Sequence, residues 1–208
     1  MTIDHRQTVE AGYDALAESF GEWMARVDGD PWERFVDELA SRLPDGARVL
    51  DLGCGNGEKL SRLAGRFQLT GVDLSEQQLG LARARVPDAE LIHADFAELD
   101  LPTGELDAVT ALYSLVHVPR GEHPALLGRI RSWLEPGGLF LASLSHVGGP
   151  DRVDDWLGVD MFFSGFDAET NSRIVREAGF ELLENEVVWM REPGLDVAFL
   201  WVLARKPR

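Results

Sequence analysis

The chain has 208 residues, of which 45 % are apolar and 27 % are charged, the balance of a globular protein rather than a disordered one. Its length favours a single domain that covers residues 1–208. A formal net charge of −16 argues against binding to duplex nucleic acid or to anionic membranes, because both attract basic surfaces. The one cysteine excludes a disulfide framework and a multi-cysteine zinc site.

No segment carries the roughly 20 apolar residues that a membrane span needs. The amino terminus, residues 1–6, is polar and lacks the apolar core of an export signal. We therefore expect a protein of the cytoplasm that does not associate with membranes.

Residues 1–46 have the apolar spacing of two helices. On the first, Val9, Leu16, Phe20 and Trp23 fall on one stripe. The sequence 29–31, Gly-Asp-Pro, interrupts the pattern, and a proline is well suited to the first position of the second helix.

The pattern changes at residue 47, where short apolar runs begin to alternate with helical segments. The predicted strands are residues 48–52, 69–73, 90–94, 108–112 and 139–143. Strands that alternate with helices in this way predict a parallel, doubly wound α/β sheet. Further along, two runs at about 181–190 and 197–204 flank the turn 192–194, Glu-Pro-Gly, so we expect a hairpin whose last strand is antiparallel.

A glycine-rich loop follows the first strand, in residues 51–57, Asp-Leu-Gly-Cys-Gly-Asn-Gly. A dinucleotide-binding fingerprint would place its third glycine at position 58, which is Glu58 here. This offset, with Asp51 two residues before the first glycine, disfavours a pyrophosphate ligand and suits an ammonium group. A tight turn between strand and helix would use the same glycines, so the loop alone is weak evidence.

Two further acids stand at the ends of predicted strands. Asp73 ends the second strand, twenty residues after Gly53, where a carboxylate can accept hydrogen bonds from both hydroxyls of a ribose. It is not needed as a helix cap, because Ser75 opens the next helix. Asp95 follows the third strand and is placed to accept a hydrogen bond from an adenine amino group, with Phe96 or Leu74 covering the ring.

These segments, residues 49–57, 71–75, 94–96 and 133–138, resemble the successive motifs of class I S-adenosylmethionine-dependent methyltransferases. The resemblance runs in register from about residue 49 to 143 and implies a seven-stranded, Rossmann-like sheet whose last strand is reversed. It implies S-adenosyl-L-methionine as cofactor and S-adenosyl-L-homocysteine as product. It also divides the chain into a helical cap (1–46), a cofactor-binding core (47–144), and a substrate-side segment with the hairpin (145–208).

The resemblance implies a set of cofactor-binding residues, spread over the lid helix, the glycine loop and the strand ends. They are Tyr13, Phe20, Asp51, Gly53, Cys54, Gly55, Gly57, Asp73, Leu74, Asp95, Phe96, Leu112 and Tyr113. Asp51 and the glycines belong to the methionine part, Asp73 to the ribose, Asp95 to the adenine, and Leu112 with Tyr113 to the far wall. Tyr13 and Phe20 resemble the lid helix of related enzymes and are candidates to face the sulfonium, although a role in the core is an equal alternative.

A hydroxyl or ammonium acceptor must also lose a proton. His117, five residues after the fourth strand, is the candidate general base, because an ordinary imidazole titrates near pH 6.5. An imidazole bonded to backbone at a helix start is the alternative. His146, after the fifth strand, is the second candidate, and both histidines are candidates to bind substrate. No histidine or cysteine spacing suggests a metal site.

The sequence therefore predicts methyl transfer from S-adenosylmethionine to an oxygen or nitrogen of a small molecule, by a monomer or homodimer. A catalytically silent S-adenosylmethionine-binding module is the alternative, followed by a nicotinamide-dependent oxidoreductase. The acidic segments that flank the core suggest a neutral or cationic acceptor, although solvated surface charge explains them better.

Overall fold

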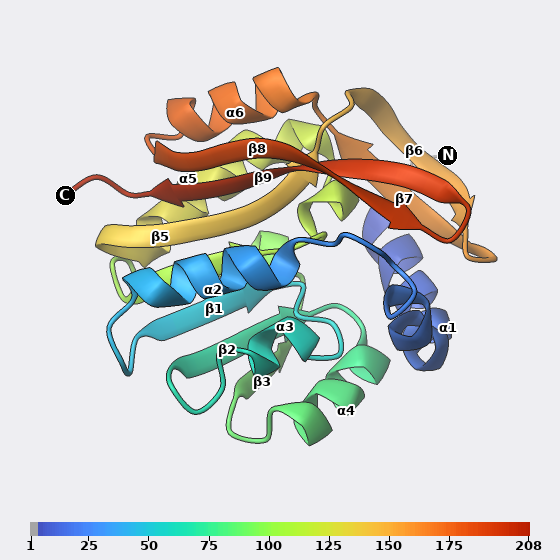
Figure 1. Cartoon of the computed structure of the whole chain (residues 1–208), viewed down its shortest axis with the longest axis horizontal. Helices are drawn as coiled ribbons and strands as arrows, with labels where there is room; N and C mark the ends of the chain where they lie inside the picture. The colour runs from blue at the N-terminus through green and yellow to red at the C-terminus, as the bar shows by residue number, and fades with distance from the viewer. Residues whose placement is uncertain (1–3) are drawn as a thin grey trace.

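The computed structural model describes residues 4–208, so the first three residues of the polar amino terminus lie outside it. A seven-stranded sheet forms its centre (Figure 1). In spatial order its strands are β3 (Glu90–His93), β2 (Gln68–Asp73), β1 (Arg48–Leu52), β4 (Leu106–Ala111), β5 (Leu134–Ser145), β9 (Leu195–Arg205) and β8 (Glu181–Glu192). The first five run parallel, whereas β9 pairs antiparallel with both β5 and β8. The predicted doubly wound sheet with a reversed last strand is confirmed.

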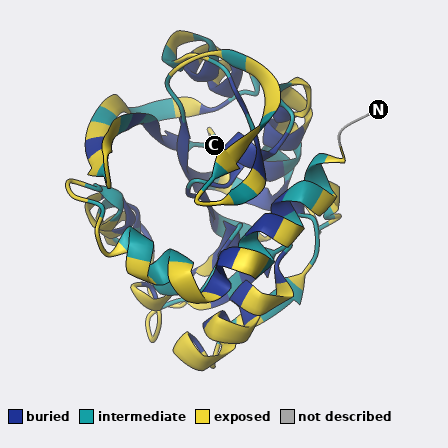
Figure 2. Ribbon diagram, turned by 90° about the vertical axis from the view of Figure 1, so that its right-hand side faces the viewer, coloured by how far each residue is buried: buried dark blue, intermediate teal, exposed yellow. Residues whose placement is uncertain are grey.

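Helices cover both faces of this sheet. One face packs against α5 (His123–Trp133) and α6 (Ala168–Glu177), and the other against α2 (Trp32–Arg42), α3 (Glu58–Ser61) and α4 (Glu76–Arg85). The central strands are buried on both faces, so their sequences are runs of apolar residues rather than alternating patterns. Figure 2 shows the buried residues gathered on the central strands and on the inner sides of the helices.

The local sequence explains where the helix that follows β2 begins. The Ser75 hydroxyl accepts a hydrogen bond from the Gln78 amide (3.1 Å), which caps α4 as the sequence predicts. Leu79, Ala82 and Val86 are buried on its inward face. This cap places the start of α4 directly beside the carboxyl end of β2, where the functional residues gather.

Two elements extend from the carboxyl edge of the sheet, α1 (His5–Met24) and the hairpin of β6 (Gly149–Trp156) and β7 (Val159–Gly165). They pack against each other through Val9, Met161 and Phe162 and lie together at one end of the molecule (Figure 1). The sequence analysis identified α1 but not this hairpin. No helix in residues 4–208 is both long and apolar enough to cross a membrane.

Candidate active site

The glycine loop turns tightly between β1 and α3 because three of its residues adopt left-handed backbone angles. The φ angles of Gly53, Gly55 and Gly57 are 77°, 52° and 75°. A Cβ atom on Gly53 would lie 2.4 Å from the Cβ of Ser114, so this position has no room for a side chain. The amides of Gly53 and Cys54 both donate to the Val72 carbonyl (2.8 and 3.0 Å), which holds the loop against the end of β2.

Asp73 is oriented by the same loop. The Gly55 amide donates to its Oδ2 (2.7 Å), and the Ser75 amide donates to its Oδ1 (2.9 Å). Burial raises the pKa of this carboxyl, and the two backbone hydrogen bonds oppose the rise. Each carboxylate oxygen has a further lone pair, so Asp73 can accept two hydroxyl groups from a ligand.

Asp51 lies beneath the loop rather than in contact with the cavity. Its side chain is 3 % exposed and accepts a hydrogen bond from the Thr110 hydroxyl (2.6 Å). Burial raises its pKa to about 6, against the opposing effects of the Thr110 hydrogen bond and the Lys59 charge. A cation bound close by would stabilise the ionised form of this carboxyl, because the cation offsets part of the cost of burying the negative charge.

Asp95 and its neighbours form the opposite end of the site. Its Oδ1 accepts a hydrogen bond from the Ala97 amide (2.8 Å), and Oδ2 lies 2.6 Å from Nε of Arg6 on α1. Leu74 and Phe96 line the cavity beside it. The carboxylate that the sequence analysis assigns to an adenine is thus ion-paired with the lid helix in this structure.

One cavity connects these groups, with about 1310 Å³ of space between its walls, including the part open to solvent. It is lined mainly by apolar surface, as is typical of small-molecule sites. The sequence-predicted residues that line it are Tyr13, Phe20, Gly53, Cys54, Gly55, Asp73, Leu74, Asp95, Phe96, Leu112, Tyr113 and His117. Three others are absent from the lining: Asp51, Gly57 and His146.

The positions of Gly57 and His146 explain their absence from the lining. A Cβ atom on Gly57 would lie 3.1 Å from side-chain atoms of Ala82 and Val86, so this glycine allows the loop to pack on α4. Nδ1 of His146 is hydrogen-bonded to the Ala198 carbonyl oxygen (2.8 Å), and the His146 ring packs against Trp189. The structure thus brings one of the two candidate histidines, His117, to the cavity.

Aromatic rings from α1 and the β6–β7 hairpin form the roof. Trp156, near the hairpin turn, packs edge-to-face against Phe20 and Trp23, with ring centroids 5.8 and 5.6 Å apart. Its ring also contacts Tyr13 at 6.1 Å and Phe163 at 5.9 Å. The roof therefore joins two segments that lie more than 130 residues apart in the chain, and it covers the cavity with water-excluding surface.

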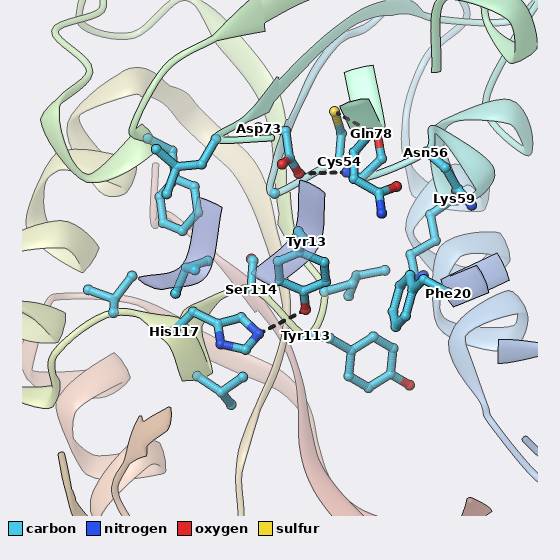
Figure 3. A pocket seen from close by; sticks show the side chains of 18 of the residues that line it. Tyr13, Phe20, Cys54, Asn56, Lys59, Asp73, Gln78, Tyr113, Ser114 and His117 are labelled. Atoms are coloured by element: carbon cyan, nitrogen blue, oxygen red, sulfur yellow. Dashed lines mark hydrogen bonds between the residues drawn. The ribbon is translucent and has the colours of Figure 1, made fainter. Parts of the chain in front are cut away.

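Tyr13 and His117 meet beneath this roof. The Tyr13 hydroxyl lies 2.9 Å from Nε2 of His117, and Nδ1 of His117 lies 2.7 Å from the Phe162 carbonyl oxygen. Figure 3 shows the Tyr13 hydroxyl pointing at the His117 ring, with Asp73, Gln78 and Cys54 on the other side of the cavity. Burial lowers the pKa of His117 to about 4, so its imidazole is neutral at pH 7.

Several residues that line the cavity were not predicted from the sequence, among them the polar residues Lys59, Gln78 and Ser114. Gln78 is 1 % exposed, yet neither polar atom of its amide has a hydrogen-bond partner within residues 4–208, and the same holds for the Ser114 hydroxyl. Buried polar groups normally have hydrogen-bond partners, so we expect the Gln78 amide and the Ser114 hydroxyl to bind a ligand or water. A polar residue on the inward stripe of α4, next to Leu79, was the signal that could have identified Gln78.

The chain is similar in sequence to known methyltransferases. Residues 49–138 match the model of a methyltransferase domain. Over these residues the chain resembles the class I S-adenosylmethionine-dependent methyltransferases. It is 33 % identical, over 74 % of its own length and 64 % of the relative's, to 27-O-demethylrifamycin SV methyltransferase of Amycolatopsis mediterranei. The chain spans between 40 % and 64 % of the lengths of the first curated relatives that it matches.

Solved structures share the fold of this chain. The structure of 1,6-didemethyltoxoflavin-N1-methyltransferase from Burkholderia thailandensis, which holds 1,6-didemethyltoxoflavin and S-adenosylhomocysteine, matches with a TM-score of 0.74 at 22 % identity. That match covers 100 % of this chain and 92 % of the other. The [4+2]-cyclase SpnF matches with a TM-score of 0.64 at 24 % identity, over 84 % of this chain and 80 % of the other. Because a cyclase shares the fold, the fold alone does not determine the reaction.

Proposed function

We propose that this protein transfers a methyl group from S-adenosylmethionine to an oxygen or nitrogen atom of a small molecule. The observation that carries the proposal is one covered cavity, in which the glycine loop and Asp73 face the same space as the Tyr13–His117 pair. The chain thus has binding groups for a nucleoside and a hydrogen-bonded proton acceptor in one enclosure.

The residues present fit S-adenosylmethionine, which supplies a methyl group already activated by a positively charged sulfur. Asp73 would accept the ribose hydroxyls, and the unpartnered amide of Gln78 lies on the same wall. Gly53 and Gly55 let a ligand approach the main chain closely. Asp51 would act on the ammonium group from beneath the loop, through its charge.

The chain's own contribution to the reaction is alignment, exclusion of water and removal of a proton. Positioning of reactants lowers barriers by roughly 7–11 kcal/mol in favourable cases. The aromatic roof excludes water, and His117 is neutral and therefore able to accept a proton at pH 7. Residues 1–46 and roughly 145–170 hold the segments that would cover the substrate, α1 and the β6–β7 hairpin, while residues 47–144 would bind the cofactor.

For the methyl acceptor we propose only a chemical class, that of small molecules. The names of two similar proteins, 27-O-demethylrifamycin SV methyltransferase and 1,6-didemethyltoxoflavin-N1-methyltransferase, support small-molecule acceptors at either oxygen or nitrogen. A neutral or cationic acceptor, a monomeric or homodimeric state and a cytoplasmic location stay predictions from the sequence.

Calorimetric titration with S-adenosylhomocysteine tests the binding half of the proposal. We expect one site per chain and a clear loss of affinity in Asp73→Ala, with Asp88→Ala, an exposed position, as the matched control. NADH should give no heat of binding. If the parent protein binds no S-adenosylhomocysteine, the proposal fails.

Transfer of tritium from methyl-labelled S-adenosylmethionine to fractionated small metabolites tests the catalytic half. We expect label in at least one fraction. Binding without any transfer would favour the silent binding module instead, since that module needs no proton acceptor.

A further inference from the structure

The hydrogen bonds around His117 determine which of its nitrogens carries the proton. The Phe162 carbonyl oxygen can only accept, so Nδ1 of His117 must donate to it (2.7 Å). In a neutral imidazole Nε2 then has no proton, and the Tyr13 hydroxyl must be the donor in the 2.9 Å contact with Nε2.

Both ring nitrogens of His117 are therefore already engaged. An acceptor molecule cannot bond to this imidazole unless one of the two contacts breaks. The Tyr13 oxygen is in a different position: it lines the same cavity, donates its one proton to His117, and has two lone pairs with no partner among residues 4–208. The group that can receive a proton from a bound molecule is the Tyr13 hydroxyl.

We propose that Tyr13 is a catalytic residue that contacts the methyl acceptor and passes its proton to His117, so that the two residues act as one general base. This inference rests on the proposed function. It changes the role of Tyr13 from a sulfonium contact, as the sequence analysis expects, to a proton carrier, and it makes His117 a residue that acts through Tyr13.

The step balances without a further reactant. The acceptor atom uses its lone pair to form the bond to the methyl carbon, and the electrons of the broken carbon–sulfur bond stay on sulfur. The proton of the acceptor moves to the Tyr13 oxygen as the Tyr13 proton moves to Nε2 of His117. The resulting imidazolium donates to the Phe162 carbonyl through Nδ1 and to Tyr13 through Nε2, and it later loses its proton to solvent.

The pair forms only when the lid helix is in place. Tyr13 is on α1, whereas His117 follows β4, 104 residues later. Polar contacts also fix the position of α1. They include a hydrogen bond from the Ser75 hydroxyl to Asp14 (2.5 Å) and the ion pair of Arg6 with Asp95 (2.6 Å). Proton removal is therefore confined to the covered state of the cavity, in which water is excluded.

The chain makes the test tractable because it contains only two tyrosines and five histidines. ¹⁵N NMR of labelled histidine in the S-adenosylhomocysteine complex should show His117 neutral, with its proton on Nδ1. Tyr13→Phe keeps the aromatic ring and removes only the hydroxyl, so it should shift the Nε2 resonance. Tyr113→Phe, the matched control for NMR, removes the other tyrosine hydroxyl of the cavity and should leave that resonance in place.

Kinetics with the acceptor found in the transfer assay complete the test. We expect kcat of Tyr13→Phe to fall about 100-fold, within the range for general acid–base catalysis, while affinity for S-adenosylhomocysteine changes less than about threefold. His117→Gln should lose a similar factor, and the double variant should be no slower than the slower single variant, because the two residues act as a unit. An acceptor analogue already ionised at the assay pH should restore most of the rate in both single variants.

A proton on Nε2 of His117 would overturn the inference, even if no acceptor had been found. So would independent, multiplying losses in the double variant, or a loss of cofactor affinity in Tyr13→Phe as large as its loss of kcat. Failure of the parent protein to bind S-adenosylhomocysteine would instead refute the proposed function.

Discussion

The buried carboxylate of Asp51 destabilises the ligand-free protein at neutral pH. Burial raises its pKa from 3.8 to about 6, whereas in the unfolded chain it ionises near 3.8. The native state thus holds the proton more tightly, and stability falls as pH rises from about 3.8 to 6 and then stays level. A difference of about two pKa units, at about 1.36 kcal/mol each, amounts to roughly 3 kcal/mol above pH 7.

Asp51→Asn isolates this effect. Asn keeps an oxygen that can accept the Thr110 hydrogen bond but cannot ionise. Its added amide donors shift stability by a constant amount at every pH, so the informative quantity is the slope. We expect the free energy of unfolding of the variant, relative to the parent, to improve by roughly 1.4 kcal/mol between pH 5 and pH 8.

Urea unfolding followed by tryptophan fluorescence at several pH values measures this difference. The same substitution at the exposed Asp88, Asp88→Asn, is the matched control. If the Asp51→Asn difference does not vary with pH more than that of the control, the Asp51 carboxyl ionises normally in the native state, and its proposed interaction with a cationic group is refuted.

Three other measurements test the site. Asp73→Asn should weaken S-adenosylhomocysteine binding roughly 10–100-fold, because hydrogen bonds to a charged group contribute about 1.5–3 kcal/mol each; unchanged affinity in calorimetry would remove Asp73 from the ribose site. Gly57→Ala should lower the free energy of unfolding by about 1–3 kcal/mol more than Gly65→Ala, since both glycines have φ near +75° but only Gly57 packs against α4. Equal losses would show that backbone strain alone matters there. Burial raises the pKa of the Cys54 thiol, so iodoacetamide at pH 8 should modify the folded protein at least about 100-fold more slowly than the urea-unfolded chain; comparable rates would mean that the loop opens readily.

Much of the cavity wall proposed to bind the cofactor could be predicted from the sequence because its signals are local. The turn after β1 needs left-handed residues, and these are glycines that lie close together in the sequence. Asp73 ends a strand and faces the same edge of the sheet as the loop, as parallel strands require. The cap at Ser75 also follows from adjacent residues.

Other features depended on packing between distant segments and left no local signal. Asp51 is a buried residue of β1 whose side chain is hydrogen-bonded to Thr110 on β4, so it lies under the loop although it is adjacent to the loop in sequence. The ion pair of Asp95 needs α1 to dock, with Arg6 at its start. The β6–β7 hairpin was not predicted because β6, its solvent-facing strand, has few apolar residues. This strand forms by pairing with β7, and the hairpin packs against α1.

The groups that would handle the acceptor all lie where α1, the β6–β7 hairpin and the segment after β4 meet. Tyr13, Trp156 and His117 come one from each, and Tyr13 contacts both of the others. We expect a substitution at Gly55 to alter cofactor affinity without moving these groups, whereas a side chain at Gly53 would displace Ser114, whose carbonyl accepts a hydrogen bond from the His117 amide. A substitution at Trp156 changes the shape of the roof and leaves Asp73 with both of its backbone partners. We therefore expect substitutions in the roof to change acceptor choice, and substitutions around Asp73 to change cofactor binding.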